Sequence, residues 1–583
     1  MKTFRIPWPV IAALLALVLA IWRALYLETI AGTYTACHGC FLLPALGNDA
    51  WLLSLLFALL GLAAFAKSRG VRMLFGALAA LLMLACALDL LLMRLFTQRL
   101  YLSDLLRFAS EGAADWSVAR TLLFSAEGTA YMLIDAVIVV VAIGLVTGSA
   151  RSVRWSKALA IGVVVAAIFA LLIQRVPLRY VHDQYAWNVI EVNLPQGRAK
   201  PFSASYVAQE LQRSKALMQV CDPGERTGKN IVIVMAESLS AYQSALLGGP
   251  QNWLPRLDAL ARANHYFTHF YANGFTTDGG EIATVTGRLP LNPPGAEVYS
   301  LSAFGPDENT VPGIARRAGY TSHYFTTADL SFLDSGKWLR DLGFDTVEGS
   351  ESPFYAGMPR GQFGAVEDAA LFARFEQWVA ERKDTTPFVS LLLTVSSHPP
   401  FIDPRTGKID PAGSFGYVDD QLANLYVQLN QHEFFSNGIL LITGDHRSMT
   451  PVPRDEFDKF GERAFARIPL IVTGAVDMSA VVDAAFQQSD IPGSLAHIMG
   501  VEYCRNSFAG YFTDPKPKGA QYVVHTRGDD RNRIDVYFGD GTATYAEDGD
   551  TSRWTSLEKP TDEEAVTAWL VSQRIKNSIV NRP

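Results

Sequence analysis

Long apolar runs dominate the first third of the chain. Five of them lie at residues 6–26, 51–66, 73–92, 131–146 and 159–173. A helix that crosses a bilayer needs about 20 apolar residues, and about 17 are tolerated. Because the shorter runs can be extended by their flanking residues, the pattern predicts a bundle of five transmembrane helices.

Basic residues indicate how these helices are oriented. Lys2 and Arg5 precede the first run, whereas residues 28–49 contain neither Lys nor Arg. Further basic residues lie in the short loops at 67–72 and 151–157. Cytoplasmic loops are enriched in Lys and Arg, so the N-terminus is expected inside. Five crossings of the cytoplasmic (inner) membrane then place the rest of the chain outside, in a periplasmic or extracellular position.

The remaining sequence alternates between short apolar runs and helical segments. The strand-like runs lie at 230–235, 321–326, 388–395, 438–443 and 468–473. Such alternation predicts an α/β domain with a mostly parallel sheet covered by helices. Strand-like segments at 522–527 and 534–545, the second containing a Gly-Asp-Gly turn, predict a small antiparallel sheet within about 520–583.

Three parts are therefore expected: a transmembrane domain at 1–177, a polar connector at 178–220 and an external domain at 221–583. Of the 583 residues, 49% are hydrophobic and only 18% are charged, which agrees with a membrane part joined to a soluble part. Residues 1–177 carry a net charge of +6 and the remainder carries −13. An acidic soluble part lacks the basic surface that nucleic acids require, so a nucleic-acid partner is excluded.

Some polar residues of the apolar half have two readings. Cys37 and Cys40 lie in the first external loop as Cys-His-Gly-Cys, which suits either a small disulfide or a zinc or redox site. Asp89 and Asp135 lie inside apolar runs, where each either contacts a lipid headgroup or substrate or pairs with a nearby Arg.

Cys221 and Cys504 are the two cysteines of the predicted external domain. The outside of a cell is oxidising, so a disulfide between them is plausible, although the sequence alone does not establish the pairing.

Polar side chains follow several of the predicted strands. Ligands of an open parallel sheet bind beyond the carboxyl ends of its strands. Glu237 follows the strand at 230–235, His398 follows the one at 388–395, and Asp445 and His446 follow the one at 438–443; Thr276 lies in a turn-like segment at 273–280. Two carboxylates and an imidazole suit Mn²⁺, Zn²⁺ or Mg²⁺.

These residue types point to phosphoryl chemistry. A threonine hydroxyl is a poor nucleophile until a metal or a base lowers its pKa, and Thr276 bound to such a metal would be activated and oriented together. The metal would also stabilise charge on a phosphoryl oxygen. His398 would hold a phosphate oxygen or protonate a leaving group.

The motifs, in this order, resemble the lipoteichoic acid synthase group of phosphoglycerol and phosphoethanolamine transferases. That group belongs to the alkaline phosphatase and sulfatase superfamily. The matching elements are Glu-Ser after a strand, Gly-Phe-Thr-Thr-Asp, His-Pro-Pro-Phe and Gly-Asp-His. The resemblance implies a five-helix bundle followed by an external alkaline phosphatase-like domain. It also implies that Glu237, Thr276, Asp445 and His446 bind one divalent metal, usually manganese.

The resemblance further implies a mechanism. Thr276 would be the nucleophile and would carry a covalent phosphoryl-headgroup intermediate, while His398 would contact the substrate phosphate. The donor would be a phospholipid such as phosphatidylglycerol or phosphatidylethanolamine, and the acceptor an envelope glycan or lipid. Thr277 is the alternative nucleophile if the register is shifted by one residue.

The sequence departs from the family at the headgroup positions. The family's Lys before the nucleophile is Phe275 here, and its glycerol phosphate-binding His, Trp and Arg fall on Thr326, Leu333 and Ser335. The headgroup is therefore left open between phosphoglycerol and phosphoethanolamine. A phosphodiesterase or sulfatase-like hydrolase that uses the same metal site, and a binding protein that only keeps the fold, are the alternatives.

Overall fold

The computed structural model shows two compact units, formed mostly by residues 1–105 and 119–195 and by residues 196–449 and 459–583. The structure describes residues 7–34, 42–96, 99–102, 126–147, 153–173, 187–193, 200–215, 217, 219–296, 298–450, 452–474, 476, 478–513, 518–528, 533–555 and 559–578. Cys37, Cys40 and the side chain of Asp135 lie outside this description, so their readings remain predictions.

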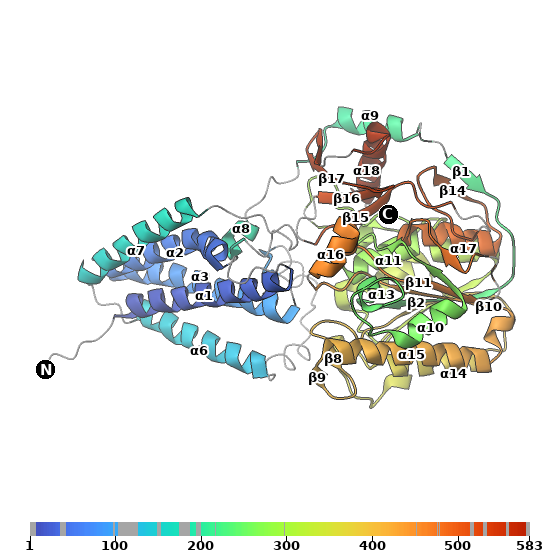
Figure 1. Cartoon of the computed structure of the whole chain (residues 1–583), viewed down its shortest axis with the longest axis horizontal. Helices are drawn as coiled ribbons and strands as arrows, with labels where there is room; N and C mark the ends of the chain where they lie inside the picture. The colour runs from blue at the N-terminus through green and yellow to red at the C-terminus, as the bar shows by residue number, and fades with distance from the viewer. Residues whose placement is uncertain are drawn as a thin grey trace. The chain divides into compact units, whose positions relative to one another are not determined.

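The first unit is helical (Figure 1). Its long helices are α1 (Trp8–Tyr34), α2 (Leu42–Phe65), α3 (Arg69–Phe96), α6 (Ala126–Thr147) and α7 (Val153–Leu172). Among the described residues, α1, α2, α3 and α7 contain stretches long and apolar enough to cross a membrane. In α6 the apolar stretch is shorter, Ala136–Leu145, and falls below the roughly 20 residues of a typical span. The structure thus supports four of the five predicted transmembrane helices and leaves α6 undecided.

Two buried ion pairs join segments of this unit. Asp89 accepts from Arg99 through both carboxylate oxygens, at 2.9 and 2.7 Å, and its Oδ1 also accepts from Leu100 N at 2.9 Å. Asp49 pairs with Arg23 at 2.6 Å. Buried charges of this kind are retained when they are paired and hydrogen-bonded. Of the two readings of Asp89, the structure supports the structural pair.

The second unit is built on an eight-stranded mixed sheet (Figure 1). Its order is β12-β3-β11-β10-β2-β7-β5-β6, with bounds β2 (Asn230–Ala236), β3 (His265–Phe267), β5 (Thr321–Thr326), β6 (Thr346–Glu348), β7 (Phe388–Leu393), β10 (Gly438–Gly444), β11 (Leu470–Gly474) and β12 (Val481–Val482). The five strands from β10 to β6 run parallel. β11 is antiparallel to β10, so the sheet is mixed rather than parallel throughout.

Alternate residues of β2 face opposite helical layers, because successive side chains of a strand point to opposite faces. Ile231, Ile233 and Met235 belong to a core with α11 (Thr277–Thr286), α12 (Val311–Ala318), α13 (Ser335–Leu342) and α17 (Ile491–Met499). Val232, Val234 and Ala236 belong to a core with α10 (Pro255–Ala263), α14 (Asp368–Glu381) and α15 (Pro411–Gln431). Burial on both faces explains why β2 reads as a continuous apolar run.

The predicted antiparallel addition is present as four strands in the order β15-β16-β17-β18. They are β15 (Val523–Thr526), β16 (Arg533–Phe538), β17 (Gly541–Asp548) and β18 (Thr551–Thr555). The segment at 534–545 forms an antiparallel hairpin of β16 and β17 around the predicted Gly-Asp-Gly turn. The final helix α18 (Glu563–Ser578) packs on this sheet through Val566, Trp569 and Leu570.

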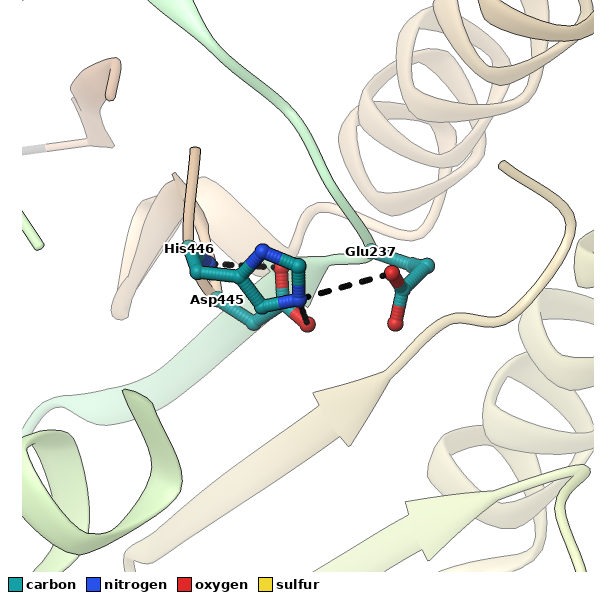
Figure 2. A group of neighbouring side chains, drawn as sticks. All are labelled: Glu237, Asp445 and His446. Atoms are coloured by element: carbon teal, nitrogen blue, oxygen red, sulfur yellow. Dashed lines mark hydrogen bonds and ion pairs between the residues drawn. The ribbon is translucent and has the colours of Figure 1, made fainter. Parts of the chain in front are cut away.

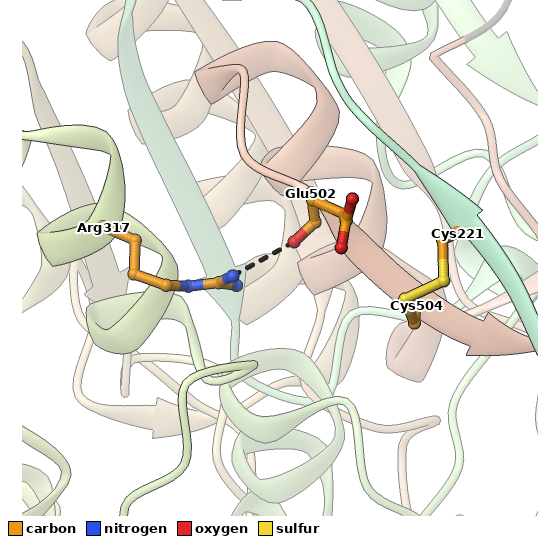
Figure 3. Close-up of a disulfide and its surroundings, with 4 residues drawn as sticks. All are labelled: Cys221, Arg317, Glu502 and Cys504. Atoms are coloured by element: carbon orange, nitrogen blue, oxygen red, sulfur yellow. Dashed lines mark hydrogen bonds between the residues drawn. A yellow bond between two sulfur atoms is a disulfide. The ribbon is translucent and has the colours of Figure 1, made fainter.

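A disulfide links two distant positions of this unit. β1 (Gln219–Asp222) pairs with β14 (Tyr503–Asn506), and Cys221 lies directly opposite Cys504. The two cysteines form a disulfide (Figure 3). The pairing that the sequence left open is therefore formed.

Replacing Cys504 with serine is expected to lower the free energy of unfolding by about 2–5 kcal/mol, since the crosslink restricts the unfolded chain between distant positions. The two cysteines are 283 positions apart. Urea denaturation followed by tryptophan fluorescence measures the change. Cys86→Ser, at a free cysteine in the helical unit, is the matched control. An unchanged unfolding midpoint in Cys504→Ser would contradict this expectation.

Candidate active site

Glu237 and Asp445 are brought together by strand register. β2 and β10 run parallel, with Ala236 opposite Gly444 at their carboxyl ends. Glu237 follows Ala236 and Asp445 follows Gly444, so the two acids lie at the same edge of the sheet. His446 follows Asp445, so three polar side chains meet beyond two neighbouring strands.

These three side chains form a compact and buried group (Figure 2). Their potential ligand atoms all lie within 4.8 Å of one another. His446 Nε2 is 3.6 Å from Glu237 Oε1 and 3.3 Å from Asp445 Oδ2. Asp445 Oδ2 and His446 Nε2 are buried without a hydrogen-bond partner in the described structure. Two unpaired polar atoms directed at one point, beside a second carboxylate, fit a divalent cation.

Local hydrogen bonds orient the group. Asp445 Oδ1 accepts from the backbone N–H groups of Ser238 and His446, at 2.8 and 2.7 Å. Ser238 Oγ donates to Glu237 Oε1 at 2.7 Å. His446 Nδ1 contacts the carbonyl of Arg447 at 2.9 Å, so Nδ1 carries the proton and Nε2 presents its lone pair. This arrangement fixes the tautomer that a metal-binding imidazole needs.

Electrostatics in the group favour an added positive charge. Burial, and then the neighbouring charge of Asp445, raise the pKa of Glu237 well above its ordinary value of 4.5. In the absence of a cation, Glu237 therefore retains a proton over a pH range in which exposed glutamates have lost theirs.

Metal affinity is therefore expected to rise with pH beyond the ordinary carboxyl range, because the metal must displace the proton of Glu237. Below the raised pKa of Glu237, the affinity should gain up to about tenfold per pH unit for each proton released. Calorimetric titration with Mn²⁺ in buffers of different ionisation enthalpy counts the protons. Glu237→Gln should bind more weakly and release fewer of them. An affinity that is constant between about pH 5.5 and 8 would argue against this.

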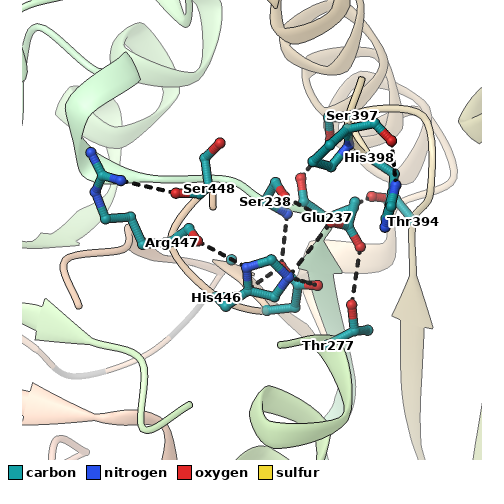
Figure 4. Close-up of polar contacts among 12 residues, drawn as sticks. Glu237, Ser238, Thr277, Thr394, Ser397, His398, His446, Arg447 and Ser448 are labelled. Carbon is teal, nitrogen blue, oxygen red and sulfur yellow. Dashed lines mark hydrogen bonds and ion pairs between the residues drawn. The ribbon is translucent and has the colours of Figure 1, made fainter. Parts of the chain in front are cut away.

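The first turn of α11 lies directly against this group. A Cβ on Gly280 would be 2.0 Å from the carbonyl oxygen of Asp445, so only glycine allows this approach. Thr277 Oγ1, at the first position of α11, donates to Glu237 Oε2 at 3.2 Å (Figure 4). A helix N-terminus carries partial positive charge and unpaired N–H groups, which suit a phosphate.

Thr276 immediately precedes this turn and occupies the N-cap position, without a capping hydrogen bond from its side chain. Together with Phe275, Pro290 and Tyr299 it lines a small cavity of about 20 Å³. A Cβ on Gly279 would be 3.4 Å from Thr276 Oγ1, so this hydroxyl lies over the helix start. The structure thus places both threonines near this group: Thr277 on the carboxylate of Glu237 and Thr276 beside a cavity.

His398 follows β7 and lies close to the same edge of the sheet (Figure 4). Its Nδ1 contacts Pro399 O at 2.6 Å and Gln362 Oε1 at 3.1 Å. Burial lowers the pKa of His398 to about 4. The ring is therefore neutral near pH 7, with the proton held on Nδ1 by the two oxygens.

Several supporting residues were not predicted from the sequence. Thr394 Oγ1 accepts from Glu237 N at 2.9 Å, and Ser397 Oγ donates to Glu237 O. Gln488 Nε2 donates to Asp445 O at 2.6 Å and to Gly444 O at 3.0 Å. Thr394 and Ser397 could have been identified from the sequence, because they lie within four residues of His398. No local sequence pattern indicates Gln488.

The positions at which the family carries basic and aromatic headgroup contacts are occupied differently here. Thr326 is buried and donates to Leu393 O at 3.0 Å. Ser335 Oγ donates to Leu330 O at 3.3 Å. Because both hydroxyls serve backbone carbonyls, neither replaces a positively charged contact to a glycerol phosphate.

Comparisons with known proteins agree with this architecture. The sequence pattern of the sulfatase family matches residues 229–501. Lipoteichoic acid synthase 2 of Bacillus subtilis is 24% identical over 309 residues, covering 48% of this chain and 46% of that protein. Phosphoglycerol transferase I of Xanthomonas euvesicatoria is 23% identical over 292 residues, covering 46% and 41%. The chain thus spans less than half the length of these curated relatives.

Solved structures were also matched. The lipoteichoic acid synthase LtaP from Listeria monocytogenes aligns with a TM-score of 0.49 and 18% identity, over 64% of this chain and 98% of that one. The C-terminal periplasmic domain of EcEptC from Escherichia coli, in complex with Zn, aligns with a TM-score of 0.37 and 16% identity, over 53% and 92%.

Proposed function

We propose that this chain, whose residues 229–501 form a domain of the sulfatase family, is a membrane-anchored, metal-dependent transferase of phospholipid headgroups. It would move phosphoglycerol or phosphoethanolamine from a phospholipid donor to an envelope glycan or lipid acceptor. The observation that carries the proposal is the buried group of Glu237, Asp445 and His446 beneath a helix N-terminus that presents two threonines.

The donor set fits one divalent metal. Two carboxylates and one imidazole nitrogen, two of them with unpaired ligand atoms, would hold it with Thr276 as a further ligand. Mn²⁺ is the expected metal, with Zn²⁺ and Mg²⁺ as alternatives. When bound, it would lower the pKa of the threonine hydroxyl and offset charge on a phosphoryl oxygen.

The chain's own residues would carry two transfer steps. In the first, Thr276 Oγ forms a bond to the donor phosphorus, the bond from phosphorus to the diacylglycerol oxygen breaks, and diacylglycerol leaves with the proton. In the second, the oxygen of an acceptor hydroxyl forms a bond to the phosphorus, the bond from phosphorus to Thr276 Oγ1 breaks, and the proton of the acceptor restores the hydroxyl of Thr276. His398 contacts the phosphate in both steps, and the N–H groups at the start of α11 hold its oxygens.

The placement of this domain outside the cytoplasmic membrane is part of the proposal. If the N-terminus is inside, the chain must cross the membrane an odd number of times to place this domain outside. This proposal therefore requires α6 to cross as the fifth helix. The disulfide between Cys221 and Cys504 supports this, since disulfides persist in oxidising compartments. A C-terminal epitope tag should be digested by protease added outside intact spheroplasts, and protection of the tag would exclude five crossings.

Mass spectrometry of the active-site peptide tests the reaction. Purified full-length protein is incubated with Mn²⁺ and with phosphatidylglycerol and phosphatidylethanolamine, without an acceptor. An adduct on the peptide containing Thr276, together with released diacylglycerol, is expected, and the adduct mass identifies the headgroup. Neither product in metal-loaded protein would show that these phospholipids are not the donors.

Hydrolysis at the same site is the second candidate function, supported by the match to the sulfatase family. Both functions share the first step, so turnover separates them. A transferase should release about one equivalent of diacylglycerol per protein and then stop, because its acceptor is absent. Continuous release without an acceptor would instead establish a phosphodiesterase.

A further inference from the structure

A second cavity lies in the same unit, away from the metal-binding group. Its volume is about 460 Å³, and it is formed by the end of α11, the segment 303–309, the short helix η9 (Gln488–Asp490), β14 and α18. α11 contacts Asp445 at its first turn, whereas its last residue, Thr286, lines this cavity. Thr277, which donates to Glu237, and Thr286 are nine residues apart, about 14 Å along the helix. The lining of the cavity includes none of Glu237, Asp445 and His446, so the cavity is a separate site.

Three cationic side chains line this cavity: Arg288, Arg505 and Lys576. None of them forms an ion pair with a carboxylate in the part of the chain that the structure describes. Arg288 is oriented by Ala303 O and Asn577 Oδ1, at 3.2 and 2.7 Å, and burial lowers its pKa. Asp307 and Asp490, the two acids of the lining, act on these cations only through longer-range electrostatics. Three cations around a partly buried cavity favour an anionic ligand.

Arg505 is the most informative of the three. It lies on β14, next to Cys504, whose disulfide links this strand to β1. Its guanidinium carbon is 4.5 Å from the ring centre of Tyr511. Its Nη1 is buried and has no hydrogen-bond partner among the described residues. A buried guanidinium nitrogen of this kind is costly unless a ligand or water satisfies it.

The two acids of the cavity do not cancel this charge. Asp490 accepts from the backbone N–H groups of Gln487 and Gly510, at 3.0 and 2.9 Å, and burial raises its pKa to about 7. Asp307 Oδ1 accepts from Asn309 N at 2.9 Å. At neutral pH the cavity therefore keeps a net positive charge, because three cations face at most two carboxylates.

The remaining lining is rich in amides and hydroxyls. It includes Gln219, Asn309, Asn506, Gln573, Ser489 and Ser572. Such side chains can both donate and accept hydrogen bonds, as the hydroxyl groups of a sugar require. The volume of the cavity falls within the usual range of small-molecule sites. The cavity is therefore larger than a single phosphate ion requires.

We propose that this cavity binds an anionic saccharide, a sugar that carries a phosphate or a carboxylate. The ligand would be either a free sugar phosphate or one unit of an acidic glycan, since both present the same chemistry. Arg505 and Lys576 bind the anionic group, and the amide side chains bind the hydroxyls. This binding requires neither the metal-binding group nor the proposed transfer reaction.

Isothermal titration of the full-length protein tests the site. The protein is treated with EDTA, so that the metal-binding group is empty, and titrated with glucose 6-phosphate, glucuronate, glucose or inorganic phosphate. Glucose 6-phosphate and glucuronate are expected to bind, with glucose and phosphate each at least tenfold weaker. The double variant Arg505→Gln/Lys576→Gln should lose at least tenfold in affinity, while Lys383→Gln/Lys408→Gln, at two exposed lysines elsewhere, should not.

Two results would overturn the proposal: equal affinity of the wild type and the double variant, or binding that disappears with EDTA. Phosphate binding as tightly as glucose 6-phosphate would overturn the saccharide assignment. If the double variant does not fold, Lys576→Gln alone is used, because Lys576 is exposed, and a threefold loss is expected. A tetragalacturonate that binds more tightly than glucuronate supports a glycan source, and equal binding supports a free sugar. No donor lipid is present, so failure of the transfer reaction does not affect the readout.

Discussion

Asp445→Asn is expected to lose tight metal binding and to reduce turnover by at least about 10³-fold. Asparagine retains an oxygen that can accept from Ser238 N and His446 N, so the local hydrogen bonds survive. It removes the negative charge and replaces the unpaired Oδ2. Metal content of the purified variant and release of diacylglycerol are the two measurements.

The same substitution should not destabilise the metal-free protein. Asp445 and Glu237 are buried together, and burial, followed by the charge of Asp445, raises the pKa of Glu237. Asparagine removes a buried charge and its desolvation cost, so the unfolding temperature in EDTA should be unchanged or higher, while added Mn²⁺ should no longer raise it. Asp540→Asn, at an exposed turn, is the matched control. A metal content equal to that of the wild type would remove Asp445 from the proposed ligands.

The second large effect concerns the two threonines. Thr276→Ala is expected to abolish the covalent adduct and to reduce turnover by at least about 10³-fold, because the nucleophile itself is removed. Thr277→Ala should retain the adduct and lose about tenfold in turnover, since Thr277 holds a carboxylate in place through a single hydrogen bond. Peptide mass spectrometry and diacylglycerol release measure both.

Thr276→Ser and Thr277→Ser serve as conservative controls, since each keeps a hydroxyl at its position. Serine should restore part of the turnover at both positions, and the adduct at position 276. An adduct that survives in Thr276→Ala but is lost in Thr277→Ala would make Thr277 the nucleophile. The hydrogen bond from Thr277 to Glu237 would then be the resting contact of the nucleophile itself.

Strand-end reasoning was sufficient to predict that Glu237 and Asp445 lie together. Both follow continuous apolar runs, and such runs identify strands that are buried on two faces. The parallel pairing of β2 and β10 then determines the contact. His446 needed no further information, because it is the next residue. This part of the site is determined by local pattern and by one topological rule.

Finer features needed three-dimensional packing. Thr276 and Thr277 are adjacent in sequence, and successive positions of a helix differ by about 100° in direction, so no motif could say which hydroxyl contacts Glu237. Gln488 contacts the carbonyl of Asp445 from 43 positions away. The crossing by α6 is likewise undecided by composition, since its apolar stretch is short.

The disulfide between Cys221 and Cys504 closes residues 221–504 of the second unit into a covalent ring. The ring encloses residues 229–501, the whole span of the sulfatase family match, with both cysteines just outside it. A protease that cuts once within the ring opens it but releases no fragment. On a denaturing gel such a nicked protein would run near full length without reductant and as two pieces with it. Glu237, Asp445 and His446 would remain on one connected molecule.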